Sequence, residues 1–114
     1  MAFPGQIDKL VTRLTELTER GKVEWQETAN SDTYLASVGK FIVTIEKAVS
    51  EVNPDNRDYS FQIKDQTRRA IDTASAMFGD DWIRLRDLHE AARRNALHSE
   101  KVVSELLSSL DQIA

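Results

Sequence analysis

The chain has 114 residues, of which 40% are hydrophobic and 30% are charged; its formal net charge is -4 and it contains no cysteine. This length corresponds to about one domain, so we expect residues 1–114 to fold around a single core. The lack of cysteine excludes a disulfide framework, a thiolate metal site and a cysteine nucleophile.

Charge is spread evenly along the chain. Residues 1–57 carry 9 acids and 7 bases, and residues 58–114 carry 10 acids and 8 bases. Nucleic-acid binding usually depends on a concentrated positive surface, so this balance argues against a nucleic-acid partner. The N-terminus lacks the pattern of a signal peptide, and no stretch reaches the ~18 to 20 apolar residues of a membrane span. We therefore expect a cytoplasmic protein with no membrane partner.

The first expected element is a helix from about Pro4 to Arg20, followed by Gly21 as a left-handed C-cap. Its apolar residues recur every three or four positions and form one stripe: Ile7, Leu10, Val11, Leu14 and Leu17. In the next segment, residues 22–28, Val23 and Trp25 alternate with charged residues. This alternation favours a short first strand.

The stretch from Asp32 to Ile45 predicts a β-hairpin. Apolar and aromatic residues alternate along both halves, as in strands with one buried face, and the two halves meet at Gly39-Lys40. Glycine permits the positive φ that a tight hairpin turn needs.

Two further strands are expected after a polar connection over residues 48–57, which contains a type I turn at residues 53–56. The first runs from about Asp58 to Lys64 and alternates clearly. A turn at residues 65–68, which lacks glycine, leads into a weaker strand from about Arg69 to Thr73. Its charged residues are typical of an edge strand.

The C-terminal third predicts two helices. One begins near Asp80, which can cap the helix after Gly79, and its apolar face consists of Trp82, Leu85, Leu88, Ala92 and Ala96. We favour a bend at residues 97–99, with Ser99 capping the second helix, although a continuous helix is the alternative. The second helix has a stripe of large apolar residues: Val102, Val103, Leu106, Leu107, Leu110 and Ile113.

This order of elements predicts an α+β fold. The short connections permit hairpins but leave no crossovers for a parallel sheet. We expect an antiparallel β-meander of three to five strands, with an N-terminal helix and one or two C-terminal helices packed on one face.

The pattern resembles a group of small uncharacterised bacterial proteins with a helix, a β-meander and a C-terminal helical segment. The residues that carry the resemblance are Trp25, Thr28, residues 32–34, residues 38–40, Leu85, Asp87, Leu88, Ala91, Arg93 and Ala96. They are structural positions rather than chemical signatures. The resemblance therefore implies a fold and a bacterial source, but no activity.

Catalytic and metal-binding motifs are weak or missing in the sequence. His89 and His98 are nine residues apart, unlike the i,i+4 pair of a zinc helix, so we interpret them as flank or surface histidines without a metal. Asp80 and Asp81 fit a helix start better than an acid/base or magnesium pair. The sequence contains no G-x-S-x-G elbow and, with four glycines, no phosphate loop. We expect no enzyme activity and no cofactor.

Protein interaction is the function that the sequence favours. The second C-terminal helix carries more apolar surface than one thin sheet needs, which suggests a contact face at Val103, Leu107 and Leu110. An exposed edge of the sheet is the other contact surface that we consider. The arginines Arg86, Arg93 and Arg94 are expected to form its selective rim, although a solvated helix face would look the same. We expect an adaptor, a regulator or an accessory resembling a type III secretion chaperone, whose partner is another protein or a second copy in a homodimer.

A ligand-binding domain or an enzyme is the alternative. It would use the cleft between the sheet and the helices, with Asp80, Asp81, Arg84 or His89 as the functional residues. Nucleic-acid binding ranks third and would show as retention on heparin or DNA that weakens steeply with salt.

Overall fold

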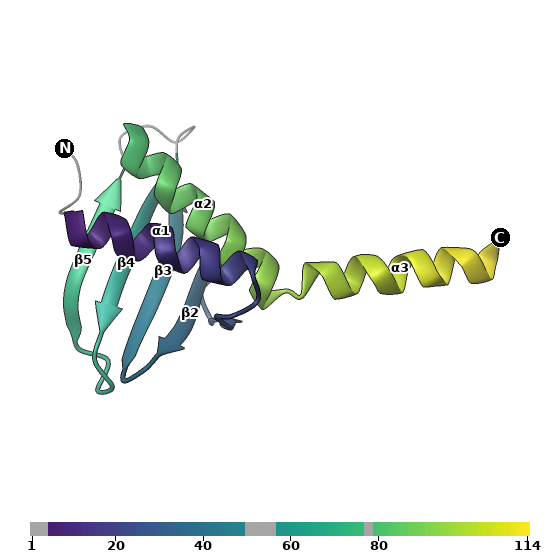
Figure 1. The fold of residues 1–114 in the computed structure, drawn as a ribbon, viewed down its shortest axis with the longest axis horizontal. Helices are drawn as coiled ribbons and strands as arrows, with labels where there is room; N and C mark the ends of the chain where they lie inside the picture. Colours follow the sequence, from purple (N-terminus) through teal and green to yellow (C-terminus); the bar gives the residue numbers. More distant parts are fainter. Residues whose placement is uncertain (1–4, 50–56, 77–78) are drawn as a thin grey trace.

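The computed structural model describes residues 5–49, 57–76 and 79–114. The elements follow in the order α1 (Gly5–Glu19), β1 (Trp25–Glu27), β2 (Thr33–Val38), β3 (Phe41–Val49), β4 (Arg57–Lys64), β5 (Ala70–Ala76), α2 (Gly79–Ala96) and α3 (Ser99–Ile113). Figure 1 shows two layers, a sheet and a pair of helices, from which α3 projects as an arm. The fold is α+β.

The five strands form one antiparallel sheet in sequence order, β1-β2-β3-β4-β5. The β2–β3 hairpin closes between Val38 and Phe41, which are paired. Gly39 in this turn has φ 61°, which glycine adopts without steric cost. The hairpin and its glycine turn are therefore confirmed.

Helices α1 and α2 lie side by side across one face of the sheet (Figure 1). Helix α2 contacts all five strands, and α1 packs against α2. An ion pair also joins the two helices, since Arg84 Nε lies 3.0 Å from Asp8 Oδ1. The element that holds the two layers together is thus α2.

The core lies between this face of the sheet and the two helices. Every second residue along the strands faces this core, because successive side chains in a strand point to opposite faces of the sheet. The largest fully buried side chains are Phe61, Ile45, Leu85, Leu88, His89 and Val11. In β2, β3, β4, α1 and α2 the period-two and helical patterns of the sequence therefore identify the buried faces, whereas the apolar residues of α3 and Ile71 of β5 are exposed.

Trp25 joins β1 to both helices. Its backbone N–H donates to Asn95 Oδ1 at 2.7 Å, and its indole Nε1–H donates to Thr18 Oγ1 at 2.9 Å. The Thr18 hydroxyl in turn donates to the Leu14 carbonyl within α1. A strand of three residues makes few ladder bonds, so these two bonds to helices position it. The short first strand is confirmed, and Trp25 lies in the core.

The turn before β5, residues 65–69, contains no glycine. Arg68 adopts φ 67°, a conformation that costs a residue with a side chain about 1–2 kcal/mol. The Asp65 carboxylate offsets this cost by accepting from the Thr67 and Arg69 backbone N–H groups at 2.9 and 3.0 Å. Hydrogen bonds from Thr67 and Arg69 hold the pKa of Asp65 below its usual value.

Most element boundaries differ from the expected ones by a few residues. β5 extends to Ala76 and is an edge strand, as expected, but Ile71 is 52% exposed. Helix α2 begins at Gly79, so Asp80 lies within its first turn. The Pro4 position and the turn at residues 53–56 lie outside the described residues.

Candidate protein-interaction site

The apolar residues of helix α3 are not covered by the other described elements of the chain. The side chains of its stripe are 52–81% exposed: Val102, Val103, Leu106, Leu107, Leu110 and Ile113. Every residue from Lys101 to Ala114 is exposed, and none belongs to the hydrophobic core. We refer to these six residues as the α3 stripe.

The bend at His98 separates α3 from the domain. His98 has φ 52° and ψ 48°, a left-handed conformation at the N-cap position of α3. Its N–H donates to the Asn95 carbonyl, and its carbonyl accepts from the Val102 N–H. One helix ends and the next begins around this residue, so α3 points away from the sheet (Figure 1). The expected bend is confirmed, but the cap position belongs to His98 and not to Ser99.

An isolated helix with the composition of α3 is a poor helix in water. Helices shorter than about 12–15 residues are marginal even when they are rich in alanine. α3 has 15 residues and includes two valines and several serines, which have lower helix propensity than alanine. Burial of its stripe against another surface would supply the stability that propensity does not. This makes α3 the candidate site.

The three arginines expected at the rim lie at different places on α2. Arg86 is near the middle of the helix, where its guanidinium lies 5.3 Å from the Trp82 ring centroid and Nη2 lies 3.2 Å from Asp87 Oδ1. Arg93 and Arg94 belong to the last turn, the part of α2 that leads to α3. Arg94, together with Lys101 of α3, lines a groove at the base of α3.

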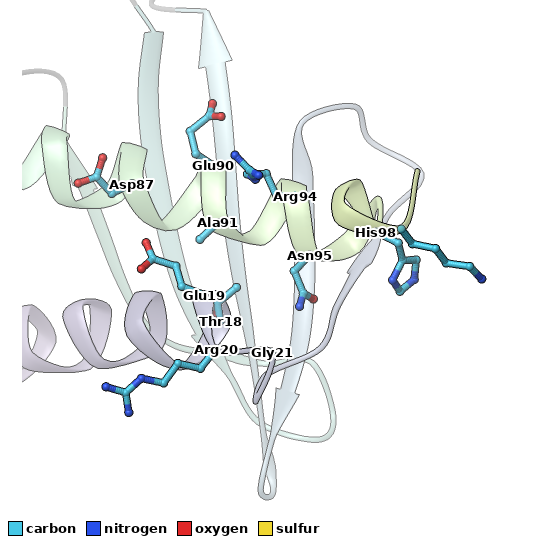
Figure 2. A pocket seen from close by; sticks show the side chains of 11 residues that line it. Thr18, Glu19, Arg20, Gly21, Asp87, Glu90, Ala91, Arg94, Asn95 and His98 are labelled. Atoms are coloured by element: carbon cyan, nitrogen blue, oxygen red, sulfur yellow. The ribbon is translucent and has the colours of Figure 1, made fainter. Parts of the chain in front are cut away.

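This groove has a volume of about 750 Å³ and is partly open to solvent. Figure 2 shows its lining side chains, which come from the end of α1, the second half of α2 and the start of α3. Its lining carries three positive groups, Arg20, Arg94 and Lys101, and three negative groups, Glu19, Asp87 and Glu90. Sequence reasoning missed the groove because its two walls are about 70 residues apart in the chain.

His89 is a core residue, and the interpretation as a flank or surface histidine is wrong. It is 1% exposed, its Nε2–H donates to the Asp32 carbonyl at 2.9 Å, and its ring lies 5.3 Å from Tyr34 and 5.5 Å from Tyr59. Burial lowers the pKa of His89 and raises those of both tyrosines. The spacing Trp82, Leu85, His89, Ala92, Ala96 places His89 on the apolar stripe of α2 and could have revealed it.

The residues named for the alternative cleft do not meet in one site. Arg84 forms ion pairs with Asp8 of α1 and Asp81 of α2, whereas His89 is buried in the core and bonds to Asp32. The groove contains none of Asp80, Asp81, Arg84 or His89. Within residues 5–49, 57–76 and 79–114, no group of three or more His, Asp or Glu side chains is placed to hold a metal ion.

The free edge of β5 is the second surface that the sequence suggested for contacts. This strand has seven residues, and a register irregularity next to Ile63 and Lys64 interrupts its pairing with β4. Such a bulge and the exposed Asp72 discourage pairing with another strand. The α3 stripe has neither a bulge nor a charged residue within it and is therefore the stronger candidate for a contact surface.

Comparisons with known proteins do not indicate a family for this chain or a role for these surfaces. No helix in the described part of the chain is long and apolar enough to cross a membrane. No family model matches the chain, and neither a curated protein nor a solved structure matches it.

Proposed function

We propose that this protein is a non-catalytic protein-interaction module that binds another protein chain through the α3 stripe. The observation that carries the proposal is that six large apolar side chains remain 52–81% exposed on a helix outside a closed core. The partner would offer an apolar groove that accepts one face of a helix, a common mode of peptide recognition.

The free energy available from α3 supports binding to an apolar surface. Full burial of one large aliphatic side chain is worth about 1.5–3 kcal/mol, so completing the burial of six half-exposed ones gives roughly 5–9 kcal/mol. Association itself costs about 4–15 kcal/mol. The partner must therefore bury apolar surface of its own, and a hydrophilic partner surface would not suffice.

The polar side of α3 influences which partner it binds. Lys101, Glu105 and Asp111 are exposed and, by helical spacing, none of them lies within the stripe. At the base of α3, Arg94 and Lys101 supply positive charge next to Asp87 and Glu90. Charges at such a rim mainly set specificity and association rate rather than affinity.

The test uses purified partner and paired variants. Val103→Asp/Leu107→Asp places two charges in the stripe, whereas Ser104→Asp/Ser108→Asp places two on the polar side. A partner captured from cell lysate is identified and then reconstituted with the purified chain. We expect the stripe variant to weaken binding by about 100-fold or more, because each buried unpaired charge costs several kcal/mol, and the polar-side variant to bind normally. Equal binding by the two variants would exclude α3 as the site.

Small-ligand binding in the groove at the base of α3 is the second candidate. Its volume of about 750 Å³ falls within the range of ligand sites, and Arg20, Arg94 and Lys101 could bind an anion. A panel of anionic metabolites in a thermal-shift assay tests this candidate. A shift of several degrees that disappears in Arg94→Ala would support it, and an unchanged melting temperature across the panel would count against it.

A further inference from the structure

The α3 stripe has the spacing of a two-helix seam. Val103, Leu106, Leu110 and Ile113 are separated by three, four and three residues. This is the alternation of a and d positions in a heptad, which keeps one line of side chains facing a parallel or antiparallel partner helix. Val102 and Leu107 border this line on its two sides. A face with this spacing is suited to pack against another helix with the same spacing.

We infer that the occupant of the α3 stripe is α3 of a second copy, and that two chains form a two-fold symmetric dimer through an antiparallel pair of these helices. This inference rests on the proposed function, because it requires α3 to be the binding element. A two-fold dimer is the commonest assembly of identical chains, and its interface uses the same surface patch on both. The stripe meets that requirement because it can pack against its own copy.

Among the α3 side chains that the structure describes, from Lys101 onward, no charged one has to be buried in this pairing. The charged residues Lys101, Glu105 and Asp111 lie outside the seam positions, and in a two-helix pair such positions remain in water. The helix stands clear of the domain along its length (Figure 1), and every residue from Lys101 to Ala114 is exposed. A second helix can therefore approach the stripe without displacing any part of the domain.

The antiparallel direction follows from electrostatics. Two antiparallel helices bring the negative end of each dipole beside the positive end of the other. This direction also places the two domains at opposite ends of the pair, so the net charge of -4 on each chain is kept apart. With 15 residues, α3 is about 22 Å long. Its tip would thus lie beside the first turn of the partner's α3.

The size of the contact sets the expected affinity. Two helices of 15 residues provide about two heptads, and the pair is smaller than the roughly 1,200–2,000 Å² of a stable standard interface. We therefore expect a reversible dimer with a dissociation constant of roughly micromolar order. A weak dimer of this kind leaves α3 accessible to a competing partner at low concentration.

Analytical ultracentrifugation of the full chain tests the pairing from about 1 µM to about 500 µM, a range that brackets micromolar dissociation constants. We expect the wild type to change from monomer to dimer within this range. Val103→Asp/Leu110→Asp should remain monomeric, and Ser104→Asp/Ser108→Asp should dimerise like the wild type. A wild type that stays monomeric, or a stripe variant that still dimerises, overturns the inference.

The direction is tested by disulfide crosslinking, which is straightforward because the natural chain has no cysteine. In the antiparallel seam Val103 of one helix lies at the level of Ile113 of the other. A mixture of the Val103→Cys and Ile113→Cys chains should form a mixed disulfide on mild oxidation, while Val103→Cys alone should not. A disulfide in the Val103→Cys sample alone would overturn the antiparallel order.

These outcomes separate the inference from the proposed function. If the wild type is monomeric at the highest concentration but binds a reconstituted different protein through α3, self-pairing is wrong and the interaction function stands. If the chain is monomeric and Val103→Asp/Leu107→Asp captures the same proteins as the wild type, both self-pairing and the proposed interaction through α3 are wrong. Dimerisation that depends on the stripe supports both.

Discussion

The imidazole Nε2 of His89 donates a hydrogen bond to the backbone carbonyl of Asp32, at 2.9 Å. The two residues belong to α2 and to the turn before β2, so this bond joins the helical layer to the start of the central hairpin. Asp32 has φ 61°, and the bond holds it in this strained conformation. The other ring nitrogen, Nδ1, is buried without a hydrogen-bond partner within the described residues.

The first prediction is that the protein loses stability in mild acid through His89. Burial lowers its pKa from 6.5 in the fold, so below about pH 6.5 the unfolded chain binds a proton that the native state excludes. The stability that comes from keeping His89 neutral is fully present above about pH 6.5. It is lost as the pH falls from 6.5 toward the lowered pKa of His89 in the native state. The free energy of unfolding should fall by up to about 1.4 kcal/mol per pH unit there.

Urea unfolding at pH 7.5 and pH 5.5 measures this effect. His89→Gln keeps an N–H donor for Asp32 without a titrating group, so its stability should vary less between the two pH values. His98→Gln, at an exposed site, is the matched control and should retain the wild-type dependence. An equal dependence in His89→Gln would show that other groups cause it. The titratable groups that face His89 are Tyr34, Tyr59, Lys47, Glu90 and Asp32. Burial raises the pKa of both tyrosines above 10, so neither titrates between pH 5.5 and pH 7.5.

The second prediction concerns the attachment of β1. Asn95→Ala removes the acceptor of the Trp25 backbone N–H, whose bond to Asn95 Oδ1 is 2.7 Å long. An unsatisfied buried donor costs about 1–3 kcal/mol, so the free energy of unfolding should decrease by this amount. Chemical denaturation measures the change. Asn95→Asp, which retains the acceptor oxygen, is the control and should lose less. Equal losses in the two variants would mean that the bond contributes little.

The third prediction is that Arg68→Gly stabilises the protein. Arg68 adopts φ 67° in the turn before β5, and glycine takes this conformation without the cost that a side chain carries. The gain is reduced by the greater freedom of glycine in the unfolded chain. We expect a net increase of about 0.5–1 kcal/mol in the free energy of unfolding. Gln66→Gly, at a neighbouring turn residue without a positive φ, should destabilise instead; a stabilising effect there would contradict this explanation.

The fourth prediction is that the domain folds without α3. Truncation after His98 removes no residue of the hydrophobic core, so at dilute protein concentration the free energy of unfolding should change by no more than about 0.5 kcal/mol. Thermal and urea unfolding of the truncated chain measure this. A loss of several kcal/mol would show that α3 packs on its own domain in solution. That result would also remove the basis of the proposed function.

Much of the fold follows from local patterns in the sequence. The hairpin at Gly39 and the end of α1 at Gly21 were predictable because only a few residues adopt positive φ readily. Arg68 and His98 also have positive φ, and their residue types gave no such signal. The lengths of β5 and of the turn before it were therefore harder to predict than the turns at glycine.

The candidate site was predictable in part. The stripe on α3 is a property of residue spacing, and the sequence suggested both the stripe and the bend at His98. Burial of His89 and the bond between Trp25 and Asn95 depend on which elements meet in three dimensions. Such contacts are set by the packing of α2 on the sheet, which single-sequence spacing does not specify. The arginines of α2 were expected to form one rim, but Arg86 lies about two turns before Arg93 and Arg94 on the helix.

The position of α2 in the chain has a consequence for synthesis of the protein. The five strands pair in sequence order, so neighbouring hairpins can form as they emerge, and contacts of this local kind form rapidly. Yet the helix that contacts all five strands ends only at Ala96. Until then the apolar face of the sheet, including Ile45 and Phe61, has no cover from α2. The growing chain is therefore prone to aggregate in the interval after β5 is made and before α2 is made.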